Sequence, residues 1–407
     1  MAISRRKFLI GGMGFFGATL LRQMSVTSTA LARLQDSIRN IDSAEDEALI
    51  WYSTRYLTAE MPMARLNSWI TPTTNFFVRN NLLLPPVSLD SWRLRVTGEV
   101  SRPLELTFDE FRRLSVSSVT NTLECAGNGR AFFRPAITAV PWRRGAVGNA
   151  LFSGPRLRDL LEKAGLKTSG HHVAFKGLDI VPPGAQEFVR SIPISKALEP
   201  STLVASHMNG AALTPEHGFP ARALVPGWIG SYSIKWLCEI RVLQNEFNGF
   251  YMSSAYRLPD GSFSGRSPFN SRSRSNKGAD HGRTEPITSL VVKSIIAHPQ
   301  DGATVSPQAS GVLTVSGAAW AGETEIEKVE VSTDGGHSWH NAGLDPDQAK
   351  YAWRLWKYTW RPAQGGAYLL LSRATDRNGN TQPQETRWNP SGYLWNGIDQ
   401  IRVTVAA

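Results

Sequence analysis

The chain has 407 residues, of which 41% are hydrophobic and 19% are charged. This length supports two or three hydrophobic cores, and the ordinary globular composition excludes a wholly disordered protein. The formal net charge is +10 at pH 7, but neither a dense Lys/Arg stripe nor a nucleic-acid-binding motif accompanies it. We therefore expect no nucleic acid as a partner and attribute the excess charge to the handling of anions. A merely solvated basic surface is the alternative.

The first 32 residues predict a twin-arginine export signal. Arg5 and Arg6 precede a weakly apolar stretch from Leu9 to Leu21, and Ala30-Leu31-Ala32 offers a cleavage site. The apolar stretch is too short to cross a bilayer, which needs about 20 apolar residues, so we expect no membrane span in the mature protein. Export by the twin-arginine route predicts a periplasmic protein that receives a complex cofactor before export. A basic N-terminal helix with an accidental Arg pair is the alternative.

Residues 33–283 predict a mixed α+β domain that ends in an exposed connector. A short helix is expected around Ala44–Tyr52, and the capping-box signature Thr107–Glu110 opens another. Leucines at helical spacing predict a third helix over Leu157–Ala164. The Ser- and Gly-rich segment Gly261–Arg283 is the connector, and the lack of a regular βαβ period argues against a Rossmann fold. Short strands are predicted at Val173–Phe175, Ala223–Val225 and Ile240–Leu243.

Residues 284–407 predict an immunoglobulin-like β-sandwich. Short alternating runs replace the mixed pattern, and turn signals such as Asp334-Gly335-Gly336 and Asn378-Gly379-Asn380 separate them. Strands at this spacing favour a sandwich. The predicted strands are Ser289–Ile296, Gly311–Ala318, Lys328–Ser332, Lys357–Arg361, Tyr368–Ala374 and Ile401–Val405.

The two cysteines, Cys125 and Cys238, have different sequence contexts. Cys125 ends a strand-like segment and precedes a glycine-rich turn and Arg130, which can present a thiolate to a pocket. The alternative for Cys125 is a small buried residue. Cys238 lies in an apolar run and is expected in the core. A disulfide is conceivable in an oxidising compartment, but these contexts argue against it. Neither cysteine lies in a C-x-x-C-H motif, so no covalent c-type haem is expected.

Four cationic positions predict an anion-binding site in the first domain. Arg79 lies among strand-forming residues, and a buried arginine needs an anionic partner. His217, Arg222 and Lys235 follow near glycines whose turns expose backbone N–H groups. Each position alone is more often a surface or capping residue. Together they suit a large phosphorylated cofactor.

Successive motifs of the chain resemble those of the sulfite oxidase family, in the family's order. In the first domain they are Phe77-Val-Arg-Asn80, Cys125-Ala-Gly-Asn128, His217-Gly-Phe-Pro220 with Arg222, Val225-Pro-Gly227 and Lys235-Trp-Leu237. In the second they are Ala319-Trp320, Val331–Gly336 with Trp339, Trp353–Trp356, Ala374–Asp376 and Asn389–Gly392. The resemblance covers about Thr71 to Val405. It implies that the second domain is the family's immunoglobulin-like dimerisation domain and that the protein is a homodimer.

The resemblance also implies a molybdenum-molybdopterin cofactor, with Cys125 as the protein's thiolate ligand to the metal. Arg79 and Arg130 match the arginines of the substrate pocket, so the implied catalytic residues are Arg79, Cys125 and Arg130. The implied cofactor-binding residues are Phe77, Val78, Arg79, Asn80, Asn81, Cys125, Asp179, His217, Arg222, Ser233, Ile234 and Lys235. The implied reaction oxidises sulfite to sulfate. Because no b-type haem domain is seen before Thr71, the expected electron acceptor is a separate c-type cytochrome.

Two positions depart from the family's pattern. Asn81 stands where the family usually has histidine, and Phe247 stands where it has an active-site tyrosine, unless Tyr251 supplies that phenol. These departures leave the exact sulfur substrate open. The alternatives are a sulfane-sulfur dehydrogenase subunit of the same superfamily and, outside it, a secreted binding protein without a redox role.

Overall fold

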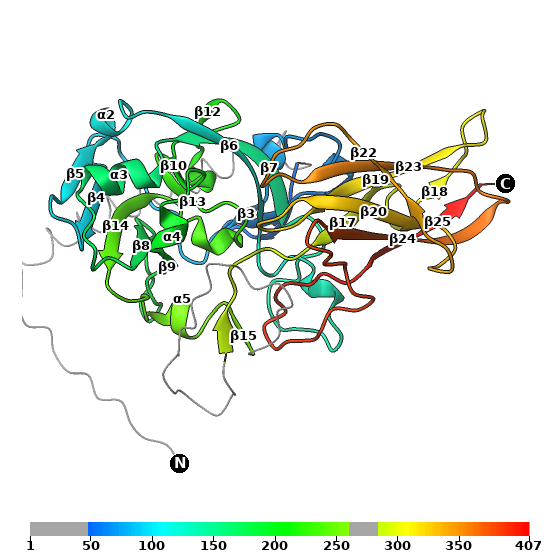
Figure 1. Ribbon diagram of the computed structural model, residues 1–407. Coiled ribbons are helices and arrows are strands. Elements are labelled where there is room, and N and C mark those ends of the chain that lie inside the picture. The colour runs from blue at the N-terminus through cyan, green and yellow to red at the C-terminus, as the bar shows by residue number, and fades with distance from the viewer. Residues whose placement is uncertain (1–47, 260–283, 407) are drawn as a thin grey trace, which may run out of the picture. The chain divides into compact units, whose positions relative to one another are not determined.

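The computed structural model describes residues 48–259 and 284–406. The predicted export signal and the connector Gly261–Arg283 lie outside these residues. The described chain is rich in sheet and its helices are short (Figure 1). An α+β part precedes a part made of two packed sheets, as the sequence predicted. No helix within the described ranges has the length and apolar character that crossing a bilayer requires.

The chain enters the fold through a three-stranded sheet of β1 (Ile50–Ser53), β2 (Thr58–Glu60) and β3 (Val78–Arg79). The helix predicted around Ala44–Tyr52 is therefore wrong in its described part. Branched and aromatic side chains in this stretch favour a strand. Tyr52 also packs edge-on against Trp142, with ring centroids 5.3 Å apart, and this tertiary contact outweighs helical propensity. Residue 79, at the end of β3, is thereby fixed beside the rest of the α+β part.

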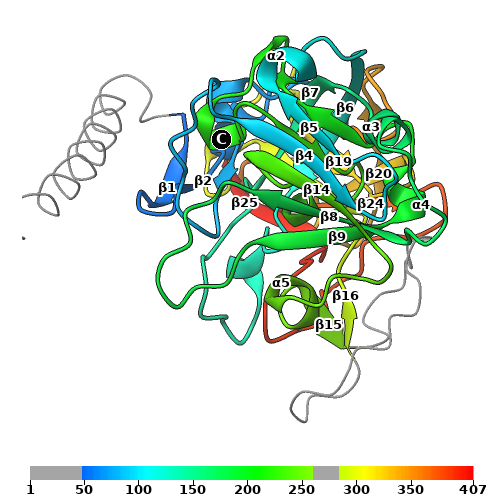
Figure 2. The same ribbon diagram turned by 90° about the vertical axis from the view of Figure 1, so that its left-hand side faces the viewer.

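Two larger sheets carry the α+β part. The five-stranded sheet, which Figure 2 shows face on, has the order β5-β4-β14-β8-β9, in which only the β14–β4 pair is parallel. Its strands are β4 (Arg93–Gly98), β5 (Leu104–Thr107), β8 (His172–Gly177), β9 (Val189–Pro193) and β14 (Leu237–Leu243). The second sheet contains β6 (Ser117–Glu124), β7 (Val147–Gly154), β11 (His207–Met208) and β12 (Ala211–Ala212). A two-stranded ribbon pairs β10 (Leu203–Ala205) with β13 (Arg222–Leu224).

Short helices link these strands. The predicted capping box is confirmed, because Thr107 and Glu110 cap α2 reciprocally. The helix predicted over Leu157–Ala164 is α3 (Leu157–Lys163), whose leucines are buried. The α-helices are completed by α2 (Phe108–Phe111), α4 (Ile194–Ala197) and α5 (Phe250–Ser253). Short 3-10 turns are η1 (Met63–Arg65), η2 (Thr73–Asn75), η3 (Arg130–Phe132), η4 (Pro215–His217) and η5 (Gly230–Tyr232).

The second part is a two-sheet sandwich, drawn in yellow to red in Figure 1. One sheet has the order β17-β19-β23-β22 and the other β18-β25-β24-β20-β21. Trp356 and Val329 lie in the apolar core between them. The first sheet contains β17 (Lys293–His298), β19 (Leu313–Trp320), β22 (Gly343–Leu344) and β23 (Arg354–Trp360). The second contains β18 (Thr304–Val305), β20 (Ile326–Ser332), β21 (His340–Asn341), β24 (Gly366–Asp376) and β25 (Asp399–Val405). The ribbon β15 (Arg257–Pro259)–β16 (Thr284–Pro286) leads into it.

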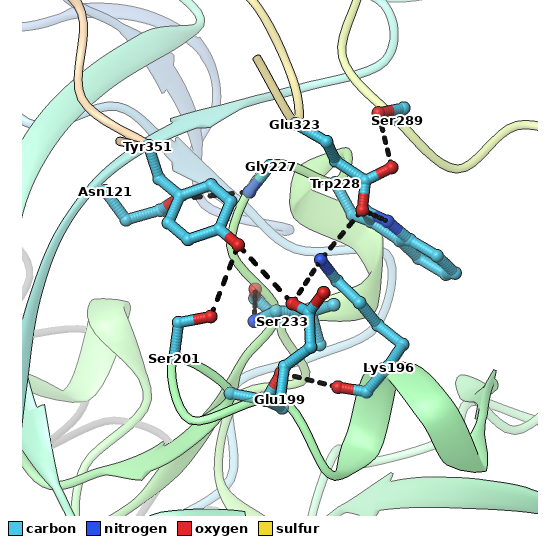
Figure 3. A network of polar contacts seen from close by, with 12 residues as sticks. Asn121, Lys196, Glu199, Ser201, Gly227, Trp228, Ser233, Ser289, Glu323 and Tyr351 are labelled. Atoms are coloured by element: carbon cyan, nitrogen blue, oxygen red, sulfur yellow. Dashed lines mark hydrogen bonds and ion pairs between the residues drawn. The ribbon is translucent and has the colours of Figure 1, made fainter. Parts of the chain in front are cut away.

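A buried polar network joins the two parts (Figure 3). Lys196 of α4 has a fully buried side chain, and its ammonium lies 2.8 Å from Glu199 and 2.9 Å from Glu323, which follows β19. Trp228 and Ser289 donate further hydrogen bonds to Glu323 at 3.2 Å each. One buried charge is thus matched by carboxylates from both parts, which couples their packing.

Candidate active site

A cavity of about 700 Å³, counting its open mouth, lies in the α+β part. It is bounded by the segments that follow β3, β6 and β8, by the end of η4 and by the stretch between η5 and β14. The structure brings together eleven of the residues singled out in the sequence: Phe77, Arg79, Asn80, Asn81, Cys125, Asp179, His217, Arg222, Ser233, Ile234 and Lys235.

Two of the singled-out residues, Val78 and Arg130, do not line the cavity. Val78 is buried in β3. The Arg130 guanidinium donates to the Ser391 carbonyl at 3.1 Å and to the Val140 carbonyl at 3.0 Å, and it lies over the Tyr393 ring. In this arrangement Arg130 ties the turn after Cys125 to the second part of the chain. A direct contact between Arg130 and substrate stays a prediction.

Cys125 directly follows β6, and a tight turn directs it to the cavity. The Cys125 amide donates to the Ala146 carbonyl at 2.9 Å, and the Cys125 carbonyl accepts from Asn128 at 2.9 Å. Gly129 has φ 89°, a left-handed conformation that glycine adopts without a steric cost. A Cβ at this position would also overlap the Trp395 ring. The turn leaves the Cys125 thiol partly exposed and in the cavity wall.

Cys238 has the core position that its apolar context predicted. It is buried in β14, its thiol lies 3.5 Å from the Lys176 carbonyl, and burial raises its pKa to about 11. Cys125 and Cys238 are both free, in agreement with the expectation that they form no disulfide. Of the two, only Cys125 can present a thiolate to a ligand.

Three basic side chains on the cavity wall are held by neutral acceptors. Arg222 donates to the carbonyls of His217 at 3.0 Å and Ser233 at 3.1 Å, and burial lowers its pKa to about 10. Lys235 donates to the Asn80 side chain and to the Glu216 carbonyl, and burial lowers its pKa well below the usual value. The pKa of His217 falls to about 3 because of burial and these two cations, so its ring is neutral at pH 7.

Several polar groups on the cavity wall are prepared for a ligand. Asn80 Nδ2, Arg222 Nε and Ser231 Oγ are buried without a hydrogen-bond partner among the described residues. A buried donor left unsatisfied costs about 1–3 kcal/mol. Burial raises the pKa of Asp179 to about 6, against the opposing effect of Lys235. The wall therefore offers cations and donors to an anionic group, with one carboxylate as an acceptor.

A separate chain of hydrogen bonds crosses the cavity wall at Arg79. The guanidinium donates to the Asn80 carbonyl and, at 2.7 Å, to Asn81 Oδ1. Asn81 Nδ2 in turn donates to the Tyr256 hydroxyl at 3.1 Å. Within residues 48–259 and 284–406 no carboxylate lies within ion-pair distance of Arg79. Its charge is therefore available to a bound anion.

Tyr256 and Phe188 line the cavity although sequence reasoning missed them. Phe247 and Tyr251, the two positions that the sequence suggested for a phenol, are not part of the lining. Phe247 packs near the Arg241 guanidinium, and Tyr251 packs edge-on against Phe188. Tyr256 lies in a segment without periodicity and in a left-handed backbone conformation, φ 56°. No sequence pattern at Tyr256 could have shown that its side chain reaches the site.

Comparisons with known proteins agree over both parts. Residues 81–251 match the oxidoreductase molybdopterin binding domain, and residues 284–406 match the Mo-co oxidoreductase dimerisation domain. A sulfite oxidase of Gallus gallus is 38% identical over 84% of this chain and 75% of its own length. The mitochondrial sulfite oxidase of Rattus norvegicus is 34% identical over 89% of this chain and 67% of its own length. The crystal structure of the sulfane dehydrogenase SoxCD from Paracoccus pantotrophus superposes with a TM-score of 0.72 at 27% identity, covering 86% of this chain and 85% of that one.

The cavity fits a molybdenum-molybdopterin cofactor. No group of three or more His, Cys, Asp or Glu side chains could hold a metal by itself in the described part of the chain, so a metal here needs further donors from a cofactor. Cys125 would add a thiolate, a soft donor, while Arg222, Lys235 and the unpartnered N–H and O–H groups suit a phosphate. Donor set, matched domains and sequence identity agree. The chain belongs to the sulfite oxidase family of molybdopterin-dependent oxidoreductases, and its cofactor is molybdenum-molybdopterin.

Proposed function

We propose that this protein oxidises sulfite to sulfate and passes the electrons to an external acceptor. Sulfite and one water give sulfate, two protons and two electrons, and two molecules of a one-electron c-type cytochrome accept the electrons. The proposal rests on a cavity that contains both the Cys125 thiol and the Arg79 guanidinium. No carboxylate among the described residues neutralises this guanidinium. Relatives named sulfite oxidases at 34–38% identity support this substrate.

The residues of the cavity divide the work. When bound, the cofactor supplies the two-electron redox chemistry. Cys125 fixes the metal from the end of β6, and Arg222 with Lys235 neutralises the cofactor's phosphate. Arg79 attracts the substrate, because a guanidinium matches two oxygens of an oxyanion. The electrostatic attraction between the guanidinium and the oxyanion is strongest in a site from which water is excluded.

Asp179 has a separate role as an acceptor for N–H groups of the pterin. A carboxyl whose pKa is about 6 is largely ionised at pH 7, and a bound N–H donor would stabilise that ionised form. The neutral His217 ring can bind the same ligand, because its contact with protein is weak: Nε2 lies as far as 3.4 Å from the Thr73 carbonyl. These two groups would orient the cofactor.

A second candidate is a sulfane-sulfur dehydrogenase, acting on a sulfur atom bound to a carrier. One observation favours it: the similarity of fold to a structure described as a sulfane dehydrogenase. Steady-state assays with free sulfite and ferricytochrome c separate the candidates. Turnover that saturates with free sulfite supports sulfite oxidation, whereas turnover seen only with a protein-bound sulfur substrate supports the alternative.

Molybdenum content tests the redox assignment itself. The protein would be produced with residues 1–32 in a host that makes the cofactor, and the metal would be measured together with sulfite activity. We expect close to one molybdenum per chain. A folded protein that contains no molybdenum from such a host would support a secreted binding protein and contradict the proposal.

We further propose that the protein acts in the periplasm as a homodimer. The support is the twin-arginine pattern at Arg5 and Arg6 for export and the match of residues 284–406 to a dimerisation domain. Replacement of both arginines by lysine is expected to retain the protein in the cytoplasm, as cell fractionation would show. Sedimentation of the exported protein is expected to give the mass of two chains, and a soluble monomer would contradict the dimer.

A further inference from the structure

A second buried ion pair joins the two parts directly behind Cys125. Glu124 is the last residue of β6 and Lys293 is the first residue of β17. Their side chains are only 3% and 2% exposed, and the Lys293 ammonium pairs with Glu124 Oε1. Trp320, which lies directly opposite Lys293 in the β17–β19 pair, donates to Glu124 Oε2 at 2.9 Å. Both oxygens of this carboxylate are therefore bound by the second part of the chain.

The same carboxylate holds the turn that carries the thiol. Asn128 Nδ2 donates to Glu124 Oε1 at 2.9 Å, and Asn128 Oδ1 accepts from the Ala146 amide at 3.1 Å. The Ala146 carbonyl in turn accepts from the Cys125 amide at 2.9 Å. Because successive side chains of a strand point to opposite faces, the end of β6 presents the thiol to the cavity and the carboxylate to the second part.

The second part holds this turn at two further points. The Leu394 amide donates to the Ala126 carbonyl at 2.8 Å. The Trp395 ring fills the space beside Gly129, where a Cβ would overlap it, and its centroid is 5.8 Å from the Lys293 ammonium. The cation that pairs with Glu124 thus contacts a ring that packs against the turn. The position of Cys125 therefore depends on contacts from the second part.

The charge of Glu124 matters as much as its hydrogen bonds. A carboxylate one residue away from a metal ligand places a negative charge beside a metal that gains and loses electrons. Buried charges are screened little by solvent and salt. An uncompensated negative charge there would favour the oxidised metal, which carries more positive charge, and would lower its reduction potential. The Lys293 ammonium cancels this charge at the point where it arises.

We propose that Glu124 and Asn128 are positioning residues that fix the Cys125 thiolate at the molybdenum, and that Lys293 sets the reduction potential of the metal by cancelling the charge of Glu124. The inference rests on the proposed role of Cys125 as the metal's thiolate ligand. It adds to the second part a role in the metal site, besides the dimerisation for which its matched domain is named.

The charge role is tested with Lys293→Gln, Glu124→Gln and the double variant. Redox titration of the holoenzymes with titanium(III) citrate, followed by Mo(V) electron paramagnetic resonance, gives the potential without any sulfite. Lys293→Gln should lower the potential and Glu124→Gln should raise it, because each leaves one uncompensated charge of opposite sign. The double variant should return close to the wild-type potential. Shifts of the same sign in both single variants, or no shift in either, would overturn the charge role.

Lys196→Met is the matched control for these variants. Lys196 also lies in a buried ion pair between the two parts, but it is not part of the cavity lining. Its loss should lower the free energy of unfolding and leave the molybdenum potential as in the wild type. A potential that shifts in Lys196→Met as far as in Lys293→Gln would show that the shift follows from destabilisation alone, and this would contradict the inference.

The positioning role is tested with Asn128→Ala, which changes no charge. The Mo(V) spectrum should broaden, because the thiolate is no longer held in one position, and molybdenum per chain after gel filtration should fall. Asn149→Ala is the control: Asn149 is buried, donates to the Trp69 carbonyl at 2.8 Å and accepts from Thr122 at 3.2 Å. It should lower stability and keep the wild-type spectrum. A wild-type spectrum and molybdenum content in Asn128→Ala would contradict the positioning role.

These measurements also separate the inference from the proposed function, because none of them requires turnover. A wild-type enzyme that does not oxidise sulfite, but whose potential shifts in opposite directions in the two single variants, would refute only the function. Sulfite oxidation by an enzyme whose potential is insensitive to Glu124 and Lys293 would refute only the inference.

Discussion

Lys196 and Lys235 are both enclosed by the protein, yet their ammonium groups face different partners. Lys196 lies between the carboxylates of Glu199 and Glu323 in the network of Figure 3. Lys235 faces the Glu216 carbonyl and the Asn80 amide oxygen, and burial depresses its pKa strongly. The charge of Lys196 is matched by the fold itself. The charge of Lys235 is matched by neutral dipoles alone at hydrogen-bond distance, within the described part of the chain.

This difference distinguishes a structural buried cation from one that is reserved for a ligand. A buried charge is tolerated when a carboxylate and further hydrogen bonds compensate it. Around Lys235 the same compensation is incomplete, and unpartnered Arg222 Nε and Asn80 Nδ2 lie on the same cavity wall. The protein therefore accepts a local cost at the cavity, which the phosphate and pterin of a bound cofactor would remove.

Substitution at Cys125 should have the largest effect. This effect should be on activity at the cavity and not on the stability of the fold. Cys125→Ser replaces a soft thiolate by a hard oxygen donor, so sulfite activity should fall by several orders of magnitude while circular dichroism and melting stay close to the wild type. Cys238→Ser is the control. It should lower the free energy of unfolding by roughly 1–3 kcal/mol, since it buries a hydroxyl, and preserve the activity of the folded enzyme. Equal losses of activity in both variants would contradict the assignment.

Breaking the Lys196 network should affect stability before activity. Lys196→Met leaves the partly buried Glu199 and Glu323 without their common cation, and loss of one partner of a buried pair costs about 3–5 kcal/mol. Denaturant titration would measure this, and the molybdenum content per folded molecule should not change. Lys357→Met is the matched control, because Lys357 pairs with Asp345 at 3.0 Å but is 63% exposed, and exposed pairs contribute at most about 1 kcal/mol. A similar small loss in both variants would show that the network does not stabilise the fold.

The cavity and the Lys196 network differ in how far they could be predicted from the sequence. The strand and glycine turn around Cys125 are local, so the chain itself indicated a thiol at a strand end, and spaced cations indicated an anion site. Lys196 and Glu323 are 127 positions apart, and no local pattern links them. The place of Tyr256 in the cavity wall was not predicted for a similar reason, because tertiary contacts impose its left-handed backbone. The strand at Ile50–Ser53 was missed because Tyr52 packs against Trp142, which lies far away in the sequence.

Substitution at Lys235 should give the opposite result to Lys196. Lys235→Met removes a desolvated charge that has no carboxylate at ion-pair distance, so the cofactor-free protein should melt at the same temperature or higher. Cofactor retention should fall instead, measured as molybdenum per chain after gel filtration. The comparison of the two lysines would fail if Lys235→Met destabilised the cofactor-free protein as strongly as Lys196→Met does.

The smallest expected effect is a pH dependence that Asp179 gives to the cofactor-free protein. Burial raises the pKa of Asp179 from 3.8 to about 6, so between these values the folded state binds more protons than the unfolded state. Stability then decreases as pH rises through this interval and is lowest above pH 6, where the buried carboxylate is charged. The difference is at most about 3 kcal/mol, at 1.36 kcal/mol per unit. Asp179→Asn should remove this slope.

Asp159, which is partly exposed on α3 and 3.3 Å from Arg158, provides the control substitution. Asp159→Asn should leave the pH profile of unfolding between pH 4 and 6 as it is in the wild type. Loading the cofactor should also flatten the wild-type profile, because N–H donors from the pterin would stabilise the ionised carboxylate and lower its pKa. A profile for Asp179→Asn that keeps the wild-type slope would mean that another group titrates, and that Asp179 is not held ready as the acceptor of this cavity.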